Sequence, residues 1–334
     1  MNKVQATLRP VLFFATQFPL DCLQNPVKLG HLSERNLLLI LPLLGEDVLL
    51  QRDVLSLWHT VIPSLAFCVK KIILPLSVMK ISVIQPDSAW EDKSRNFQKL
   101  GELISPLNNN TDIVVLPEMF NTGFSMHPAE LGESPLGETF DWMKSLADMG
   151  NFGLCGSYIV KDNTEYLNRW VFVSPDNEVS FYDKRHLFSM GGEDRLFTAG
   201  KSRLTFTFRG VKISPYICYD LRFPVWSRNR NESDLIIYSA NWPEIRKNVW
   251  PTLLKARAIE NQCYVAGSNR TGTDGTGITY SGDSMIIDPR GEIIASADRD
   301  KECSVSAAIS LPELSEFRKK FPVMNDADDF TINL

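Results

Sequence analysis

Three side chains with catalytic chemistry stand at the ends of apolar runs in this sequence. Cys218 follows a run that closes on Ile217, and the chain turns polar directly after it. Glu118 and Lys184 offer a carboxylate and an amine after two earlier apolar runs. A residue at a strand end is held by the sheet behind it while its side chain faces open space. The three positions therefore indicate a Glu–Lys–Cys triad.

The setting of Cys218 is suited to covalent catalysis. A thiolate is a strong nucleophile, and backbone N–H groups after a strand end can bind the oxyanion that develops during attack on a carbonyl. A thiol with an ordinary pKa near ~8.5 is ionised to only a few per cent at neutral pH. A neighbouring ammonium would raise that fraction, and Lys184 is its expected source.

Each residue of the triad has a simpler explanation when it is taken alone. A single cysteine among apolar neighbours fills the core, which is our interpretation of Cys155 and Cys263. A single lysine is usually a solvated surface charge, and a single glutamate usually caps a helix or forms a local ion pair. Only the joint occurrence of Glu118, Lys184 and Cys218 favours catalysis.

The elements that must hold these residues alternate between strands and helices. Apolar runs predict strands over 79–85, 112–116, 153–160, 170–174, 179–182, 204–208, 211–217, 235–240, 263–267, 283–287, 292–297 and 304–309. Helical spacing predicts helices over 90–104, 140–147, 244–260 and 311–321. Residues 272–282 are interpreted as a flexible loop. This alternation is typical of a layered α/β fold.

Composition excludes several classes of function. The chain has 334 residues, of which 44% are hydrophobic and 22% charged, as in a globular protein with a large core. Its net charge of −5 disfavours binding to nucleic acid, which requires clustered Lys and Arg. The six cysteines lie far apart and predict reduced thiols, so we expect a cytoplasmic location.

Histidines are scarce, and this argues against a metal centre. The chain has four, and only His127 and His186 follow position 79. Neither lies at ligand spacing from a second His or a Cys. We therefore expect no metal and no cofactor.

Further motifs flank the triad in a fixed order. They are Met190-Gly191-Gly192-Glu193, Ala240-Asn241-Trp242-Pro243, Ala256-Arg257-Ala258-Ile259-Glu260-Asn261 and Gly282-Asp283-Ser284. With these motifs and the order Glu118, Lys184, Cys218, the chain resembles the nitrilase superfamily of carbon-nitrogen hydrolases. The resemblance runs from Met79 nearly to Leu334 and is nearest to the omega-amidase branch.

The resemblance implies a role for each site residue. Cys218 is the nucleophile, and Lys184 stabilises the oxyanion together with the N–H of Tyr219. Glu118 takes the thiol proton, delivers it to the departing ammonia and later activates water. Glu193 resembles the additional glutamate of the family, which orients Lys184 or the substrate.

The resemblance also implies the substrate class. Omega-amidases release ammonia from the terminal amide of small 2-oxo dicarboxylic monoamides such as 2-oxoglutaramate and 2-oxosuccinamate. A cation must then meet the free carboxylate, and Arg222, Arg185 and Arg246 are the candidates by chemistry. The residues expected to bind the substrate are Tyr219, Arg222, Asn241, Trp242 and Phe124.

For the fold, the resemblance implies a four-layer αββα sandwich over residues 79–334. Such domains pack against a second copy that covers an outer helical layer, so a homodimer or a larger assembly is expected. Residues 1–78 read as an extension outside this fold, either poorly ordered or translated from upstream of the true start at Met79. Their apolar runs are too short for a membrane span of ~18 residues.

Three alternatives stay open on the sequence. A nitrilase or another small-amide hydrolase would use the same fold and triad. A Cys/His hydrolase would use His186 or His127 as its base. A non-catalytic interaction module would keep the sandwich without the chemistry, although an intact triad argues against it.

Overall fold

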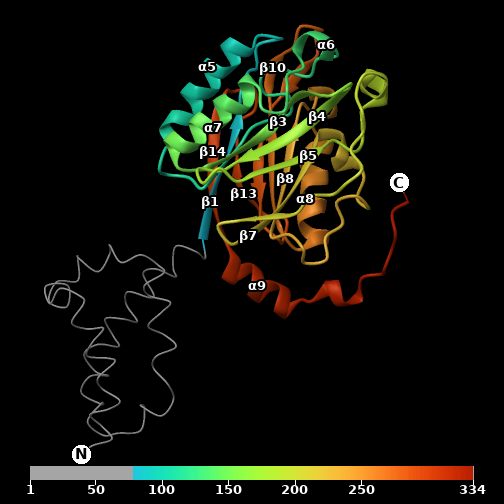
Figure 1. The fold of residues 1–334 in the computed structure, drawn as a ribbon. Helices are drawn as coiled ribbons and strands as arrows, with labels where there is room; N and C mark the ends of the chain where they lie inside the picture. Colours follow the sequence, from blue (N-terminus) through green and yellow to red (C-terminus); the bar gives the residue numbers. More distant parts are fainter. Residues whose placement is uncertain (1–77, 334) are drawn as a thin grey trace, which may run out of the picture. The chain divides into compact units, whose positions relative to one another are not determined.

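The structure is a computed structural model that describes residues 78–333 (Figure 1). The expected extension over residues 1–78 lies, apart from Val78, outside the described residues, and the boundary at Met79 stays a prediction. Val78 already pairs with Ser310, so strand β1 (Val78–Gln85) begins one residue before Met79. Within residues 78–333, no helix has the length and apolarity that a membrane crossing requires.

Six strands form the first sheet, in the order β14-β1-β2-β3-β4-β5. β1, β2 (Ile113–Val115) and β3 (Gly153–Asp162) run parallel. β4 (Glu165–Val173) and β5 (Val179–Asp183) follow as antiparallel hairpins. β14 (Cys303–Ser310) pairs antiparallel with β1 along its whole length. The first and last strands of the described fold are therefore neighbours.

The second sheet also has six strands, in the order β13-β12-β9-β8-β7-β6. Its three central strands are parallel, and its outer strands are antiparallel. The bounds are β6 (Phe206–Phe208), β7 (Val211–Ile217), β8 (Leu235–Ala240), β9 (Tyr264–Asn269), β12 (Met285–Ile287) and β13 (Ile293–Ser296). Central parallel strands are covered on both faces, which agrees with the continuous apolar run Leu235–Tyr238 in β8.

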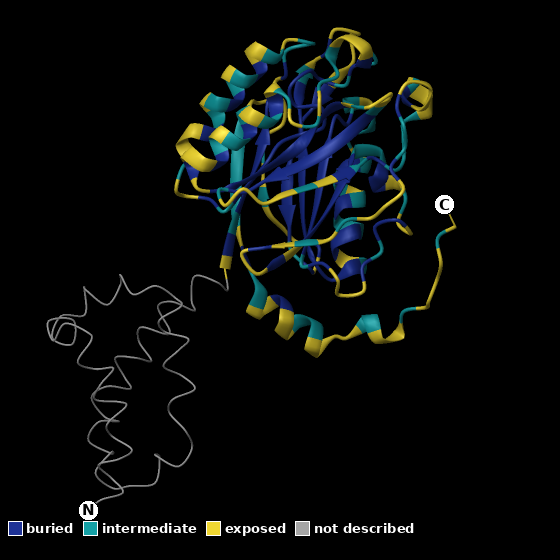
Figure 2. Ribbon diagram, viewed as in Figure 1, coloured by how far each residue is buried: buried dark blue, intermediate teal, exposed yellow. Residues whose placement is uncertain are grey.

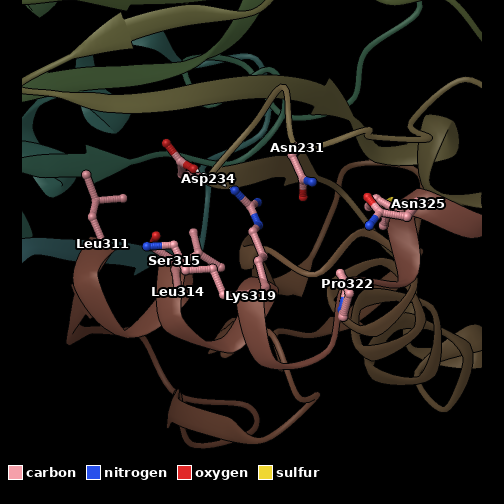
Figure 3. A pocket seen from close by; sticks show the side chains of 10 residues that line it. Asn231, Asp234, Leu311, Leu314, Ser315, Lys319, Pro322 and Asn325 are labelled. Atoms are coloured by element: carbon pink, nitrogen blue, oxygen red, sulfur yellow. Dashed lines mark hydrogen bonds and ion pairs between the residues drawn. The ribbon is translucent and has the colours of Figure 1, made fainter.

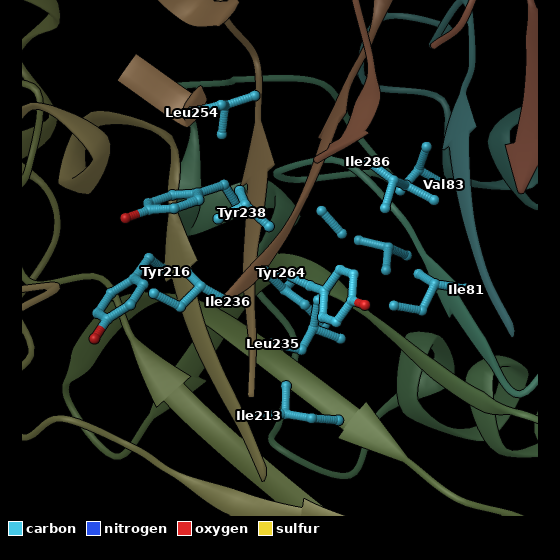
Figure 4. Packing of buried hydrophobic residues seen from close by; sticks show 14 of the residues in the cluster. Ile81, Val83, Ile213, Tyr216, Leu235, Ile236, Tyr238, Leu254, Tyr264 and Ile286 are labelled. Atoms are coloured by element: carbon cyan, nitrogen blue, oxygen red, sulfur yellow. The ribbon is translucent and has the colours of Figure 1, made fainter. Parts of the chain in front are cut away.

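The core lies largely between the two sheets. Figure 4 shows Ile81 and Val83 of β1 in one cluster with Ile213, Leu235 and Ile286 of the second sheet. Burying one such side chain contributes about 1.5–3 kcal/mol relative to leaving it in water.

Helices cover the outer face of each sheet. α5 (Lys93–Ile104) and α7 (Glu138–Gly150) pack on the first sheet through a second apolar cluster that includes Leu100 and Met143. α8 (Val249–Asn261) packs on the second sheet through Trp250 and Leu254. Figure 2 shows the strands buried between these partly exposed helices. The predicted four-layer αββα sandwich is confirmed.

Two predicted elements differ from the structure. The expected helix over 244–260 is split, because Glu244–Arg246 forms a separate 3₁₀ turn whose Arg246 carbonyl accepts from the indole Nε1 of Trp242 at 2.9 Å. The expected loop over 272–282 contains a hairpin of β10 (Thr271–Thr273) and β11 (Thr279–Ser281). A short helix α6 (Pro128–Leu131) and helix α9 (Leu311–Lys320) complete the layers.

Candidate active site

Three strand ends from the two sheets meet at one cavity. Glu118 lies three residues after β2, and Lys184 and Cys218 directly follow β5 and β7. All three side chains line a cavity of about 180 Å³. The structure therefore brings together the residues that the sequence predicts as a triad.

Cys218 sits on a strained strand-to-helix turn. It begins the 3₁₀ helix η9 (Cys218–Arg222), and its φ of 42° lies in the left-handed region. This conformation costs a residue with a Cβ about 1–3 kcal/mol and persists only where the surrounding structure enforces it. The thiol Sγ lies 3.8 Å from the carbonyl oxygen of Asn241, within the cavity wall.

A fully buried carboxylate, Asp220, holds this turn against the strand that precedes the cavity lysine. It accepts hydrogen bonds from the N–H of Ile217 at 2.9 Å, the hydroxyl of Tyr182 at 2.8 Å and the N–H of His186 at 3.0 Å. Tyr182 and His186 stand on either side of the lysine, and Ile217 precedes the cysteine. Asp220 thus fixes the two segments relative to each other.

Lys184 is buried between two carboxylates. Its Nζ lies 2.7 Å from Oε1 of Glu118 and 2.8 Å from Oε2 of Glu193, and the three side chains are at most 1% exposed. The backbone N–H of Phe188 donates to the same Glu193 oxygen at 2.6 Å. The ammonium also faces the ring of Phe124, 5.2 Å from its centroid. Because removing one partner would leave an uncompensated buried charge, the cluster is strongly interdependent.

Burial and charge act in opposite directions on this cluster. Burial alone lowers the pKa of Lys184, yet Glu118 and Glu193 outweigh it, and the pKa lies above that of an ordinary lysine. Burial raises the pKa of Glu193 against the lowering effect of Lys184. Lys184 is therefore held as an ammonium.

The thiol of Cys218 is held in its protonated form. Burial, followed by the negative charge of Glu118, raises its pKa well above the ordinary value, and Lys184 only partly opposes them. Lys184 thus lowers the pKa of Cys218, as the sequence predicts, but burial and Glu118 outweigh this effect. The ammonium of Lys184 is already paired with two carboxylates, which limits its effect on the thiol.

The five residues expected to contact substrate all line the cavity, namely Phe124, Tyr219, Arg222, Asn241 and Trp242. The guanidinium of Arg222 lies over the Trp242 ring, 5.0 Å from its centroid. Arg246 also lines the cavity and lies over Phe188, whereas Arg185 does not line it. Arg185 lies instead over Trp226 and donates to the carbonyl of Gly200 at 3.3 Å.

Sequence reasoning missed the wall formed by the β10–β11 hairpin. Asp274, Thr276, Ile278 and Tyr280 line the cavity from this segment. The Asp274 carboxylate accepts the Tyr280 hydroxyl at 2.8 Å and the backbone N–H groups of Thr276 and Ile278. An Asp whose side chain binds the N–H two residues later is typical of an Asx turn, and it could have indicated this hairpin.

Sequence reasoning also missed Asn168, a fully buried amide in β4. It donates to Glu118 and Glu193 at 2.9 and 3.0 Å. The sequence carried no distinct signal for it, because the polar residues Glu165 and Arg169 belong to the same strand.

The histidines do not support the Cys/His alternative. The ring of His186 pairs with Asp220 at 2.8 Å and stacks on Phe223, and His127 pairs with Glu91. Neither is among the residues that line the Cys218 cavity. In the part of the chain from 78 to 333, no group of three or more His, Cys, Asp and Glu side chains is arranged to hold a metal.

A larger hollow of about 480 Å³ lies beside α9 and does not contain the triad (Figure 3). Arg318 on its wall is already engaged, since it pairs with Asp234 at 3.0 Å and donates to the carbonyl of Ser233. The smaller cavity is the candidate active site, because Cys218, Glu118 and Lys184 line it.

Comparisons with known proteins show the family of this chain. A family model described as carbon-nitrogen hydrolase matches residues 80–319. The omega-amidase YafV of Escherichia coli K12 is 44% identical over 254 residues, which are 76% of this chain and 98% of that protein. A 2-oxoglutaramate amidase of Bacillus subtilis is 36% identical over 251 residues, 74% of this chain and 96% of that protein.

A similar solved structure is that of XC1258 from Xanthomonas campestris, a CN-hydrolase superfamily protein with an arsenic adduct in its active site. It is 39% identical to this chain, its TM-score is 0.75, and the match covers 77% of this chain and 99% of that chain.

Proposed function

The chain belongs to the carbon-nitrogen hydrolase family, and we propose that it acts as an omega-amidase on small 2-oxo dicarboxylic monoamides such as 2-oxoglutaramate and 2-oxosuccinamate. The observation that carries this proposal is one cavity that holds a buried Glu118–Lys184 pair, a strained cysteine and two arginines. The products are ammonia and a 2-oxo dicarboxylate.

The first half of the reaction forms a thioester. Glu118 takes the thiol proton as Sγ of Cys218 attacks the amide carbon, so a C–S bond forms and the carbonyl oxygen becomes an oxyanion. The Lys184 ammonium and the N–H of Tyr219 stabilise that oxyanion, and each such donor contributes about 3–4 kcal/mol. Glu118 then protonates the nitrogen, the C–N bond breaks, and ammonia leaves.

The second half regenerates the thiol. Glu118 removes a proton from a water molecule that attacks the thioester carbon. The C–S bond breaks, and the proton returns to Sγ of Cys218. Glu193 holds Lys184 in place through both halves, because its carboxylate contacts Nζ with both oxygens, at 2.8 and 3.1 Å.

The arginines at the cavity are the candidates for the substrate carboxylate. Arg222 and Arg246 are each placed over an aromatic ring of the cavity, which holds a guanidinium in one orientation. A cavity of about 180 Å³ suits a substrate of this small size.

An assay of ammonia release from a panel of amides and nitriles tests this proposal. We expect turnover of 2-oxoglutaramate, loss of turnover in Cys218→Ala, and retained turnover in the control Cys303→Ala, whose cysteine lies outside the cavity. Turnover of nitriles alone would favour the nitrilase alternative. Full turnover by Cys218→Ala would refute the nucleophile, and no turnover of any compound would favour the interaction module.

We also propose that residues 79–334 form the hydrolase domain and that it works in the cytoplasm as a homodimer. The outer face near α8 exposes Ile259, Ile293 and Ile294 at 53%, 40% and 40%, and a second copy would cover such apolar side chains. Sedimentation equilibrium should give twice the chain mass, and Ile259→Lys should shift it toward the monomer. Cell fractionation of the native host tests the location.

A further inference from the structure

Asn168 contacts several residues of the site, although the proposed chemistry assigns it no role. Its Nδ2 donates to Oε1 of Glu118 at 2.9 Å and to Oε1 of Glu193 at 3.0 Å. Its backbone carbonyl accepts the N–H of Lys184 at 3.0 Å. One residue of β4 therefore contacts all three members of the buried charge cluster.

The orientation of the Asn168 amide is determined by its neighbours. The hydroxyl of Ser157 on β3 accepts the N–H of Met119 at 3.0 Å and lies 2.8 Å from Oδ1 of Asn168. Because Oδ1 has no hydrogen, the hydroxyl must donate to it, and Nδ2 is left to face the carboxylates. Met119 has a φ of 42°, so the same relay also holds the strained turn beside Glu118.

We propose that Asn168 is a positioning residue that orients Glu118 and Glu193 around Lys184 and leaves one oxygen of Glu118 to act as the base. Oε1 of Glu118 receives Lys184 at 2.7 Å in addition to Asn168. Oε2 receives only the N–H of Asn241, at 3.0 Å. Since Oε1 already has two donors, Oε2 is the oxygen with a free lone pair for the proton of Cys218.

Only an amide fits this position. The carboxylates of Glu118 and Glu193 both accept hydrogen bonds from one nitrogen atom, so the side chain at this position needs two N–H donors on that atom and no negative charge. Aspartate is isosteric but offers no donor to ionised partners and adds repulsion. Alanine removes both donors. Serine can satisfy one carboxylate at most.

The kinetic test of this inference rests on the proposed function, because it needs the proposed substrate. The contacts of Asn168 do not depend on that function. We expect Asn168→Ala to lower kcat about a hundredfold with KM little changed, because misplacing a catalytic group by about 1 Å has this effect. Asn168→Asp should lose more, and Asn168→Ser less. The hydrogen bonds from Asn168 stabilise the ionised form of the carboxylates. Their loss in Asn168→Ala favours the protonated form, so the acid limb of kcat/KM should move to higher pH.

Other titratable and charged groups share the cavity and could move the same limb. They are Lys184, Cys218, Arg222, Arg246, Asp274 and Tyr280. Within residues 78–333 the Asn168 side chain forms hydrogen bonds with Glu118, Glu193 and Ser157 and with none of these groups, so the shift should require the loss of the amide itself.

Asn229 provides a matched control. It is a buried amide that donates to the carbonyl of Ser233 and accepts two backbone N–H groups, and it does not line the cavity. Asn229→Ala should lower the melting temperature without moving the pH profile. If Asn168→Ala changes the melting temperature and nothing else, or if Asn229→Ala moves the acid limb equally, the inference is overturned.

A readout without substrate separates this inference from the proposed function. The rate of Cys218 alkylation by iodoacetamide, followed by mass spectrometry between pH 5 and 8, reports proton transfer from the thiol to the carboxylate pair. The acid limb of this alkylation rate should move to higher pH in Asn168→Ala, or in Asn168→Ser if the alanine variant does not fold. An unchanged limb refutes the inference. A moved limb in a protein that hydrolyses no amide would refute the proposed function alone.

Discussion

The space between the two sheets and the charge cluster of Glu118, Lys184 and Glu193 beside the cavity are both buried, but they contain different kinds of side chain. Between the sheets lie apolar side chains such as Ile81, Ile213 and Ile237. At the cavity, an ammonium and two carboxylates lie beside a cysteine in a left-handed conformation. Apolar packing stabilises the fold, whereas buried ion pairs often contribute little or nothing to stability. The difference separates the part of the molecule that stabilises the fold from the part to which we assign the proposed chemistry.

The largest effect should come from removing the centre of the charge cluster. Lys184→Met leaves two carboxylates buried without a counter-ion, which should lower the free energy of unfolding by about 3–5 kcal/mol and abolish turnover. Urea denaturation and the ammonia assay measure the two effects. The exposed Lys301, which pairs with Asp298 at the surface, provides the control Lys301→Met. Unchanged stability in Lys184→Met would contradict the comparison.

The raised pKa of Cys218 should make the stability of the protein depend on pH above neutrality. The pKa of Cys218 is raised in the folded state, so the contribution of its thiol to stability is complete below the pKa of the unfolded chain and is lost as pH rises through the folded pKa. In this window the unfolded chain releases a proton that the folded chain keeps.

Stability should therefore fall above pH 9, with a contribution from Cys218 of about 1.4 kcal/mol per pH unit. Urea denaturation at pH 8, 9 and 10 should show a shallower loss in Cys218→Ala than in the unchanged protein. Burial also raises the pKa of Cys155, which serves as an internal reference present in both proteins. Equal slopes would mean that the thiol ionises in the folded state.

The smallest effect should come from a conservative change between the sheets. Ile237→Val removes one methylene from a fully buried side chain, which should lower the free energy of unfolding by about 0.5–1.5 kcal/mol. Turnover at 25 °C should stay within a factor of two, because no cavity residue is changed. Loss of turnover without a matching loss of stability would show that the sheets transmit strain to the site.

The strands and the grouping of Glu118, Lys184 and Cys218 could be predicted from the sequence, because both depend on local patterns and on motif order. The four layers followed from the family resemblance and were confirmed. The β10–β11 hairpin could not be predicted, because its strands are three residues long, contain no apolar alternation and depend on the Asp274 turn. The catalytic roles stay predictions until the variants are tested.

The protonation of the site could not be read from the sequence. Whether Lys184 activates a thiolate depends on how many carboxylates share its charge, and Glu193 comes from a separate 3₁₀ turn. The contacts of Asn168 depend in the same way on the pairing of β4 with β3 and β5. Burial and distances across sheets decide these questions, and neither is a property of local sequence.

The pairing of β1 with β14 has a consequence for biosynthesis. Ser82 and Ser306 are 224 positions apart, yet their hydroxyls lie 2.7 Å from each other. β1 lacks this neighbour until β14 has been synthesised, so the first sheet keeps an open edge while the ribosome adds the residues between the two strands. The nascent chain therefore has a long interval in which it benefits from chaperone protection, and a stalled or truncated product would expose that edge to aggregation.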